Sequence, residues 1–374
     1  MKDYCKLDRK FVERKSHDYK DFVAAAARGK RIGWDDVLEN KASVIIAAAN
    51  AGKTMEMQQR ALEEREAGRP ASFLALRRLL TLDTLERALE GPSRTCYLAW
   101  RNSSTELLTL FVDSLDEAAA THRDNIEYLV GKLMNELGSA RERVRWVFST
   151  RPAIITPNFL PMLAQLLDVQ YTVQVRSSNS EDGLVDSIAG VSDAKMASVV
   201  STSASGLKVF RLMDLEADQA IRYLEETRRM SNSKSLIETA GERGLFGLCQ
   251  TPGGLDVIAR INLLDDPPRS LTEVFNRVAR EVHKLRSDDK RLDDILGLNV
   301  QDLEDAAERI ASASQICGLE NIEIPVERSE ISNDVLSAFH IAAPKLNQKA
   351  IEHLLSSQIF IDDSYHQVKM YPEC

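Results

Sequence analysis

The stretch SVIIAAANAGKTMEMQQRALEEREAG occupies residues 43–68 and carries the strongest indication of the fold. It begins with a run of β-branched and small apolar residues (43–49), passes through Asn-Ala-Gly, and continues into a segment of helix formers that ends at Gly68. A short apolar run closed by turn-forming residues predicts a buried strand, and the segment that follows predicts a helix. A strand that leads through a tight loop into a helix is half of a βαβ unit.

The loop between this strand and helix carries groups suited to phosphate binding. Phosphates need backbone N–H groups that point inward, the positive end of a helix, a lysine for the terminal phosphates and a hydroxyl for Mg²⁺. Gly52, Lys53 and Thr54 supply the last three of these parts. The residues expected to contact a nucleotide here are Ala49, Asn50, Ala51, Gly52, Lys53, Thr54 and Met55.

The loop departs from the pattern G-x-x-x-x-G-K-[ST] at one fixed position, because Ala47 stands where the first glycine is expected. Ala tolerates most backbone geometries with negative φ, and Asn50 is able to adopt a left-handed conformation. We therefore expect nucleotide binding to survive and fast hydrolysis to be lost.

A second apolar strand, residues 106–113, runs into Asp113-Ser114-Leu115-Asp116-Glu117, roughly 60 residues after the loop. An aspartate at the end of a buried strand holds Mg²⁺ in a P-loop site, so Thr54 and Asp113 are the expected metal-binding residues. Asp116 and Glu117 follow at a distance suited to orienting or deprotonating the attacking water. The same residues also fit an acidic helix cap, but their occurrence after the loop favours a nucleotide site.

A third strand, VRWVFSTRP at residues 144–152, ends in Ser-Thr-Arg before a proline. Arg151 at this position is expected to sense the γ-phosphate, or else to be a surface arginine before a turn. We assign Asp116, Glu117 and Arg151 as the candidate catalytic residues.

Apolar runs and amphipathic segments alternate along the first half of the chain. This alternation predicts an α/β protein, a P-loop NTPase parallel sheet with helices on both faces. The expected strands are residues 43–49, 72–76, 95–100, 106–113, 144–152 and 209–215. The expected helices are residues 55–68, 80–91 and 124–140.

The remaining segments have other patterns. Residues 1–40 predict a helical arm with one amphipathic helix from Phe11 to near Gly29, and the segments after Asp218 are helical. A helix at 348–358 precedes a hairpin at 359–371 around an Asp-Asp-Ser-Tyr turn. The expected domains are an N-terminal arm (1–40), a P-loop NTPase domain (41–215) with a Ser-rich loop insertion (176–207), an all-helical domain (216–320) and a winged-helix-like domain (321–374).

Composition limits the class of protein. The 374 residues are 44% hydrophobic and carry a formal net charge of −9, so a folded chain is expected and a surface built to hold nucleic acid is not. The five cysteines lie far apart and are expected to be free thiols in a reducing compartment. No apolar stretch is long enough to span a membrane, so the expected location is cytoplasmic.

The segments ANAGKT, FVDSLDEA and FSTRP together resemble the NACHT branch of the STAND-class P-loop ATPases, which are relatives of AAA+ proteins. In that branch the Mg²⁺-binding aspartate, here Asp113, is followed by a small residue, here Ser114, and then by further acids. The segment LCQTPGGLDVIA is similar to the one in which a proline of the family, here Pro252, approaches the nucleotide. His366, or else His353, would be the phosphate-sensing histidine, although the family's usual His-Pro stands here as Tyr-Pro.

The resemblance implies a bacterial switch that binds ATP or ADP with Mg²⁺, hydrolyses ATP slowly and self-oligomerises. Such proteins often act in antiviral defence or signalling with effector and sensor parts, which for this chain would be fused or separate proteins. Neither a membrane nor nucleic acid is an expected partner. Two alternatives stay open: a scaffold with a degenerate P-loop that does not hydrolyse, and an AAA+-like DNA-dependent ATPase.

Overall fold

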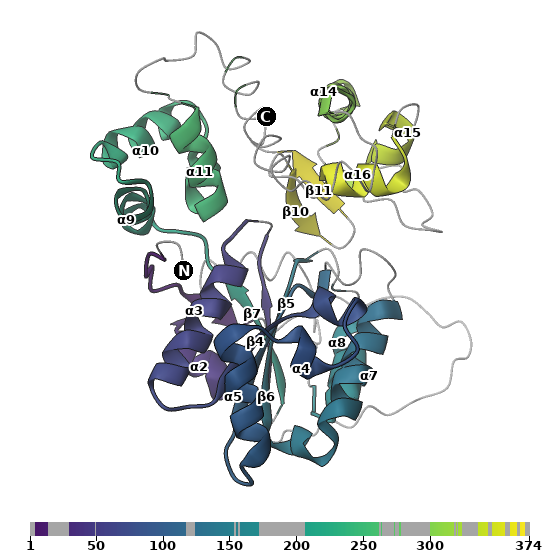
Figure 1. Ribbon diagram of the computed structural model, residues 1–374. Helices are drawn as coiled ribbons and strands as arrows, with labels where there is room; N and C mark the ends of the chain where they lie inside the picture. The colour runs from purple at the N-terminus through teal and green to yellow at the C-terminus, as the bar shows by residue number, and fades with distance from the viewer. Residues whose placement is uncertain are drawn as a thin grey trace, which may run out of the picture.

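The computed structural model in Figure 1 describes most of the first half of the chain and parts of the second. The described residues are 4–13, 30–48, 50–116, 124–152, 155, 158–171, 206–261, 263, 273, 277, 300–317, 319, 321–323, 336–342, 346–355, 360–364 and 367–370. Among the described helices, none combines the length and the apolar character needed to cross a bilayer.

The described residues form a seven-stranded sheet with the strand order β2-β1-β7-β3-β6-β5-β4. Strands β7, β3, β6, β5 and β4 are parallel, whereas β1 pairs antiparallel with both β7 and β2. The strands are β1 (Phe11–Glu13), β2 (Arg31–Ile32), β3 (Ala42–Ile46), β4 (Ala71–Ala75), β5 (Leu108–Asp113), β6 (Val144–Thr150) and β7 (Leu207–Leu212). This order is compatible with a P-loop-like α/β fold, and it places β6 between the strand before the loop and the strand that ends in Asp113.

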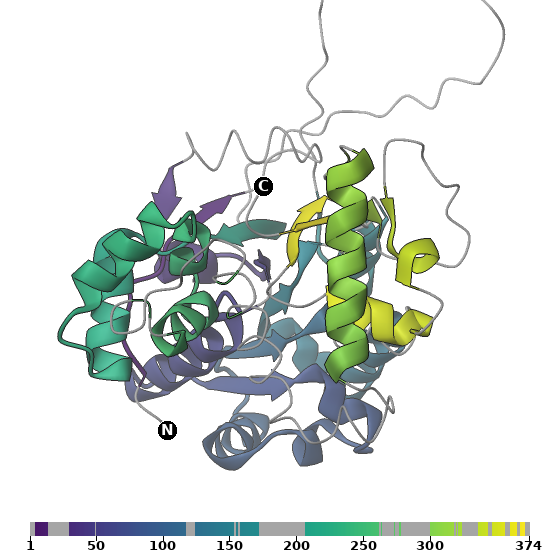
Figure 2. The same cartoon turned by 90° about the horizontal axis from the view of Figure 1, so that it is seen from above.

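Helices cover both faces of the sheet, as the sequence predicts. Side chains alternate along a strand, so Ile45 and Val44 of β3 enter different apolar clusters. One cluster includes residues of α2 (Trp34–Leu38) and α3 (Lys53–Glu66). The other includes residues of α4 (Leu85–Ala88), α5 (Gly91–Asn102), α7 (Asp124–Leu137) and α8 (Phe159–Leu167), and Figure 2 shows the helices around the sheet from above.

The strand expected at residues 95–100 is wrong, because this segment lies inside α5. The helix begins at Gly91 with a proline in its first turn, a favoured place for proline. Tyr97 and Trp100 are buried while Leu98 is 39% exposed, which is a helical spacing of buried positions. The helix expected at 80–91 is also shorter than predicted, because Thr84 caps the four-residue α4.

The helix expected from Phe11 is wrong at its start, because Phe11–Glu13 forms β1. Phe11 is fully buried and packs edge-on against Trp34, with ring centroids 4.9 Å apart. Two apolar residues followed by a glutamate are compatible with either a helix or a strand, and pairing with β7 decides between them. The rest of the expected helix, residues 14–29, lies outside the described residues.

After β7 the chain forms helices, as expected. They are α9 (Ala217–Arg228), α10 (Ser233–Glu242), the 3₁₀ turn η4 (Phe246–Gln250) and α11 (Pro252–Arg260). Two further 3₁₀ turns, η1 (Leu76–Leu80) and η2 (Gly138–Arg143), lie within the first half. Most of the expected helix near residues 271–286 and most of the Ser-rich insertion lie outside the described residues.

The C-terminal part contains α14 (Val300–Cys317), α15 (Ala338–Ala342), α16 (Gln348–Leu355) and a second sheet. The order of this sheet is β10-β11-β8-β9, with β8 (Asn321–Glu323), β9 (Leu336–Ser337), β10 (Phe360–Ser364) and β11 (Gln367–Met370). The expected hairpin is confirmed, since β10 and β11 pair antiparallel. The Asp-Asp-Ser stretch that was expected in the turn belongs to β10 instead.

Cysteine reactivity provides a test of this packing. Cys5, Cys96, Cys249 and Cys317 are free, as expected. Burial raises the pKa of both Cys5 and Cys249 to about 12, whereas Cys317 is exposed. Because the thiolate is the reactive form, iodoacetamide at pH 8 is expected to label Cys317 quickly and to leave Cys5 and Cys249 unlabelled until urea is added. Peptide mass spectrometry measures each site, and equal labelling of Cys249 and Cys317 in the folded protein would contradict the burial.

Candidate functional site

The loop after β3 forms its left-handed turns although Ala47 stands where the phosphate-binding pattern has a glycine. Asn50 has φ of 58° and Gly52 has φ of 89°, so the left-handed positions fall on an asparagine and a glycine. Ala47 lies outside the left-handed region and is buried, and its N–H donates to the carbonyl of Thr150 at 3.2 Å. The methyl group of Ala47 is therefore accommodated. Ala49 lies outside the described residues.

Lys53 is the first residue of α3 and follows Gly52, which is the helix N-cap. Its Nζ donates to the carbonyl oxygens of Ala47 and Ala48 at 2.6 and 2.8 Å. The ammonium group therefore lies over the loop, at the same helix terminus whose backbone N–H groups favour anions.

Thr54 and Asp113 come together although they are far apart in the sequence. Thr54 Oγ1 donates to Asp113 Oδ2 at 2.6 Å, and Asp113 is 3% exposed. A hydroxyl and a carboxylate at this position are oxygen ligands of the kind that Mg²⁺ prefers. The sequence predicted both residues for this role.

Ser149 on β6 completes this cluster, although the sequence pattern assigned a role at this strand end only to Arg151. Its Oγ donates to Asp113 Oδ1 and accepts a hydrogen bond from the N–H of Ser114 at 3.0 Å. Ser114 has φ of 65°, a conformation that few residues other than glycine adopt. The signal available in the sequence was a hydroxyl residue near the end of a strand, and only the strand order shows that β6 lies next to β5.

Asp116 and Arg151 form an ion pair, with Arg151 Nε 2.9 Å from Asp116 Oδ2. The other carboxylate oxygen of Asp116, Oδ1, is buried and lacks a hydrogen-bond partner within the described part of the chain. A buried acceptor of this kind is costly unless another group occupies the site in function. The structure thus brings two candidate catalytic residues together, while Glu117 lies outside the described residues.

Pro252, at the start of α11, lies against the loop. A Cβ built on Gly52 would lie 3.3 Å from Pro252 Cγ, and the N–H of Gly253 donates to the carbonyl of Asn50 at 3.2 Å. Met55 is 39% exposed on the first turn of α3. His366 lies outside the described residues, as does the side chain of His353, so a role for either histidine stays a prediction.

Comparison with protein-family models gives no match for this chain, and no curated protein matches it. The chemistry of the site therefore rests on its geometry. That geometry joins a lysine at a helix N-terminus, a hydroxyl–carboxylate pair and a second carboxylate held by an arginine, all at one end of the parallel sheet. These groups suit a ligand that carries phosphates and a divalent cation.

Proposed function

We propose that the chain binds ATP and ADP with Mg²⁺ at the loop after β3. The observation that carries the proposal is the 2.6 Å hydrogen bond between Thr54 and Asp113 beside Lys53. Lys53 and the N–H groups at the start of α3 would hold the phosphates, and Thr54 and Asp113 would hold the cation. The cation would supply charge neutralisation at the phosphates.

The proposed class is a nucleotide-dependent switch of the NACHT/STAND type. Contacts of Pro252 and Gly253 with the loop support this class, because a ligand that reshapes the loop would also act on α11. Slow hydrolysis agrees with the pairing of Asp116 with Arg151, which occupies one oxygen of the candidate base. Self-oligomerisation, and effector and sensor parts used in antiviral defence or signalling, are proposals from the sequence resemblance alone.

Isothermal titration calorimetry of the full chain tests nucleotide binding directly. We expect MgATP and MgADP to bind with dissociation constants in the micromolar range or below, and mass spectrometry of the denatured protein to show any nucleotide that co-purifies. Heat exchange no larger than that of dilution, together with no co-purified nucleotide, would refute the proposal.

The metal requirement gives a second prediction. Asp113→Asn keeps the shape of the side chain and removes the charge that would hold the cation. The affinity of this variant for MgATP is therefore expected to be about tenfold lower than that of the wild type. Adding EDTA should weaken ATP binding by the wild type and have little effect on this variant. The matched control is Asp83→Asn, since the side chain of Asp83 is 88% exposed and lies outside the site. An identical response of both variants to EDTA would contradict a metal role for Asp113.

A further inference from the structure

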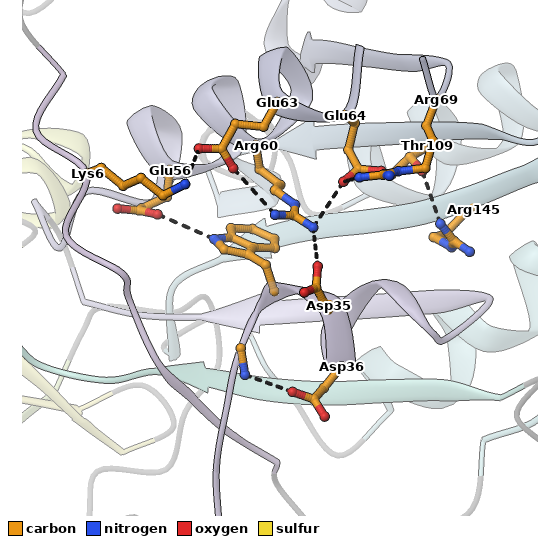
Figure 3. Close-up of polar contacts among 12 residues, drawn as sticks. Lys6, Asp35, Asp36, Glu56, Arg60, Glu63, Glu64, Arg69, Thr109 and Arg145 are labelled. Carbon is orange, nitrogen blue, oxygen red and sulfur yellow. Dashed lines mark hydrogen bonds and ion pairs between the residues drawn. The ribbon is translucent and has the colours of Figure 1, made fainter. Parts of the chain in front are cut away.

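The segment of residues 4–10 lies between α3 and α9 (Figure 1). On the side of α3, the hydroxyl of Tyr4 donates to Glu56 Oε1 at 3.2 Å, and Lys6 Nζ lies 3.2 Å from Glu63 Oε1. Figure 3 shows Lys6 beside these two carboxylates, and Glu56 also accepts a hydrogen bond from the indole of Trp34. The segment is thus attached to the helix that begins with the nucleotide-binding loop's lysine.

The same segment is attached to α9 on its other side. Gln219 Nε2 donates to the carbonyl of Leu7 at 2.5 Å, and Arg222 Nη1 donates to the carbonyl of Lys6 at 3.3 Å. Cys5 and Leu7 are buried in the apolar cluster that contains residues of α9, α10 and α11. A movement of α9 would therefore disturb this segment.

Arg9 joins the two sides. Its Nη1 donates to the carbonyl of Ala51 in the loop at 2.9 Å, and its Nη2 donates to the carbonyl of Met213 at 2.6 Å, between β7 and α9. A Cβ built on Gly52 would lie 3.6 Å from the same Nη1. One guanidinium group therefore links the loop to the connection that leads into α9.

The position of Arg9 is energetically costly. The residue is 3% exposed, and its Nε lacks a hydrogen-bond partner in the part of the chain that the structure describes. Burial lowers the pKa of Arg9, and the nearby charge of Glu56 opposes that effect. A buried guanidinium with an unsatisfied donor lowers the stability of the folded state. Stability alone therefore does not explain why this group is used to bind two carbonyl oxygens.

We propose that Arg9 is a positioning residue that couples the conformation of the nucleotide-binding loop to the position of α9. The inference rests on the proposed nucleotide site and adds a route by which its occupancy reaches α9, beside the contact of α11 with the loop. When a ligand reorients the peptide groups of the loop, the carbonyl of Ala51 moves relative to Arg9. The bond of Arg9 to Met213 and the bond of Gln219 to Leu7 together carry that change toward α9.

The test is hydrogen–deuterium exchange of peptides that cover α9, measured on the full chain with and without saturating MgADP. In the wild type, MgADP should change the exchange of these peptides. In Arg9→Gln the change should be largely lost at saturation, with nucleotide affinity reduced about tenfold at most. Arg9→Lys should give an intermediate response, because an ammonium group lacks the fork that spans both carbonyls.

The control is Arg31→Gln, because Arg31 pairs with Glu216 beside α9 and contacts none of the loop residues described above. It should keep the full response. A purely structural role for Arg9 predicts a lower melting temperature with an unchanged response of α9 to MgADP, and that result would overturn the inference. If the wild type binds no nucleotide, the proposed function fails and the inference fails with it.

A second variant covers the case in which Arg9→Gln does not fold. Gln219→Glu removes the amide donor to Leu7 on the α9 side, keeps a side-chain oxygen for the N–H of Glu216 at the start of α9, and leaves the loop contacts in place. It should keep nucleotide affinity within about twofold of the wild type while the exchange response of α9 falls. A full response in this variant would show that the segment 4–10 does not carry the coupling.

Discussion

Lys53→Ala is expected to weaken the binding of MgATP and MgADP at least about 100-fold, which removes detectable binding in calorimetry. The reason is that the ammonium group is a positive charge placed over the loop at the N-terminus of α3, where its Nζ lies 2.6 Å from the carbonyl of Ala47. Alanine at the first position of α3 leaves the helix intact, because alanine has the highest helix propensity.

The matched control is Lys234→Ala on α10. The side chain of Lys234 is 78% exposed and lies 3.9 Å from Glu238, so its loss changes the net charge by the same amount without touching the loop. Far-ultraviolet circular dichroism of both variants shows whether the fold is kept. Equal affinity of Lys53→Ala and Lys234→Ala for MgATP would remove the basis for a nucleotide site.

Trp146→Ala is expected to lower the free energy of unfolding by about 3–5 kcal/mol. Trp146 lies on β6, is 1% exposed, and stacks on Phe148 with ring centroids 5.8 Å apart. Its removal leaves a cavity in the apolar cluster that joins the sheet to α5, α7 and α8. Because β6 also carries Ser149 and leads to Arg151, the loss of packing acts directly beneath the site.

Urea denaturation followed by circular dichroism measures this loss. Tyr128→Ala is the control, since Tyr128 is an aromatic residue that is 63% exposed on α7. Its substitution should change the free energy of unfolding by less than about 0.5 kcal/mol. A similar midpoint for the two variants would show that the β6 core is not packed as described.

The loop and the hydroxyl–carboxylate pair of Thr54 and Asp113 could be predicted because their signals are local. Lys53 and Thr54 follow a strand and open a helix, and Asp113 ends another strand, so each position is set by the residues next to it in the sequence. Parallel strands of one sheet bring their carboxyl ends to the same edge, which is why Thr54 and Asp113 could be expected to meet.

Other parts of the site could not be predicted in this way. The role of Ser149 depends on β6 lying next to β5, and the contact of Pro252 with Gly52 depends on how α11 packs on the loop. The neighbours of Ser149 gave no signal for its role, whereas Pro252 was expected near the loop only from the resemblance of the segment around it. Arg9 also gave no signal, because a single arginine in a charged segment is usually a solvated side chain.

The two wrong predictions of secondary structure, a strand at 95–100 and a helix from Phe11, have the same cause: contacts with distant segments decided the structure. Residues 95–100 are a short apolar run, and Phe11 and Val12 are two apolar residues at the start of a charged segment, so the periodicity at each place fits more than one structure. The packing of Tyr97 and Trp100 on the sheet selected a helix for the first, and pairing with β7 selected a strand for the second.

The sequence by itself determined the parallel α/β core, the loop with its lysine and threonine, and the aspartate at the end of β5. Hydrophobic periodicity and turn residues involve only a few neighbouring positions, so the strands, helices and loops that they specify can be recognised from the sequence. The tertiary structure alone decided that Ser149 and Arg9 belong to the surroundings of this site, and it placed Pro252, which the resemblance had led us to expect there, against Gly52. Those contacts arise from strand order and helix packing, whose free energy comes from burying surfaces that are far apart in the sequence.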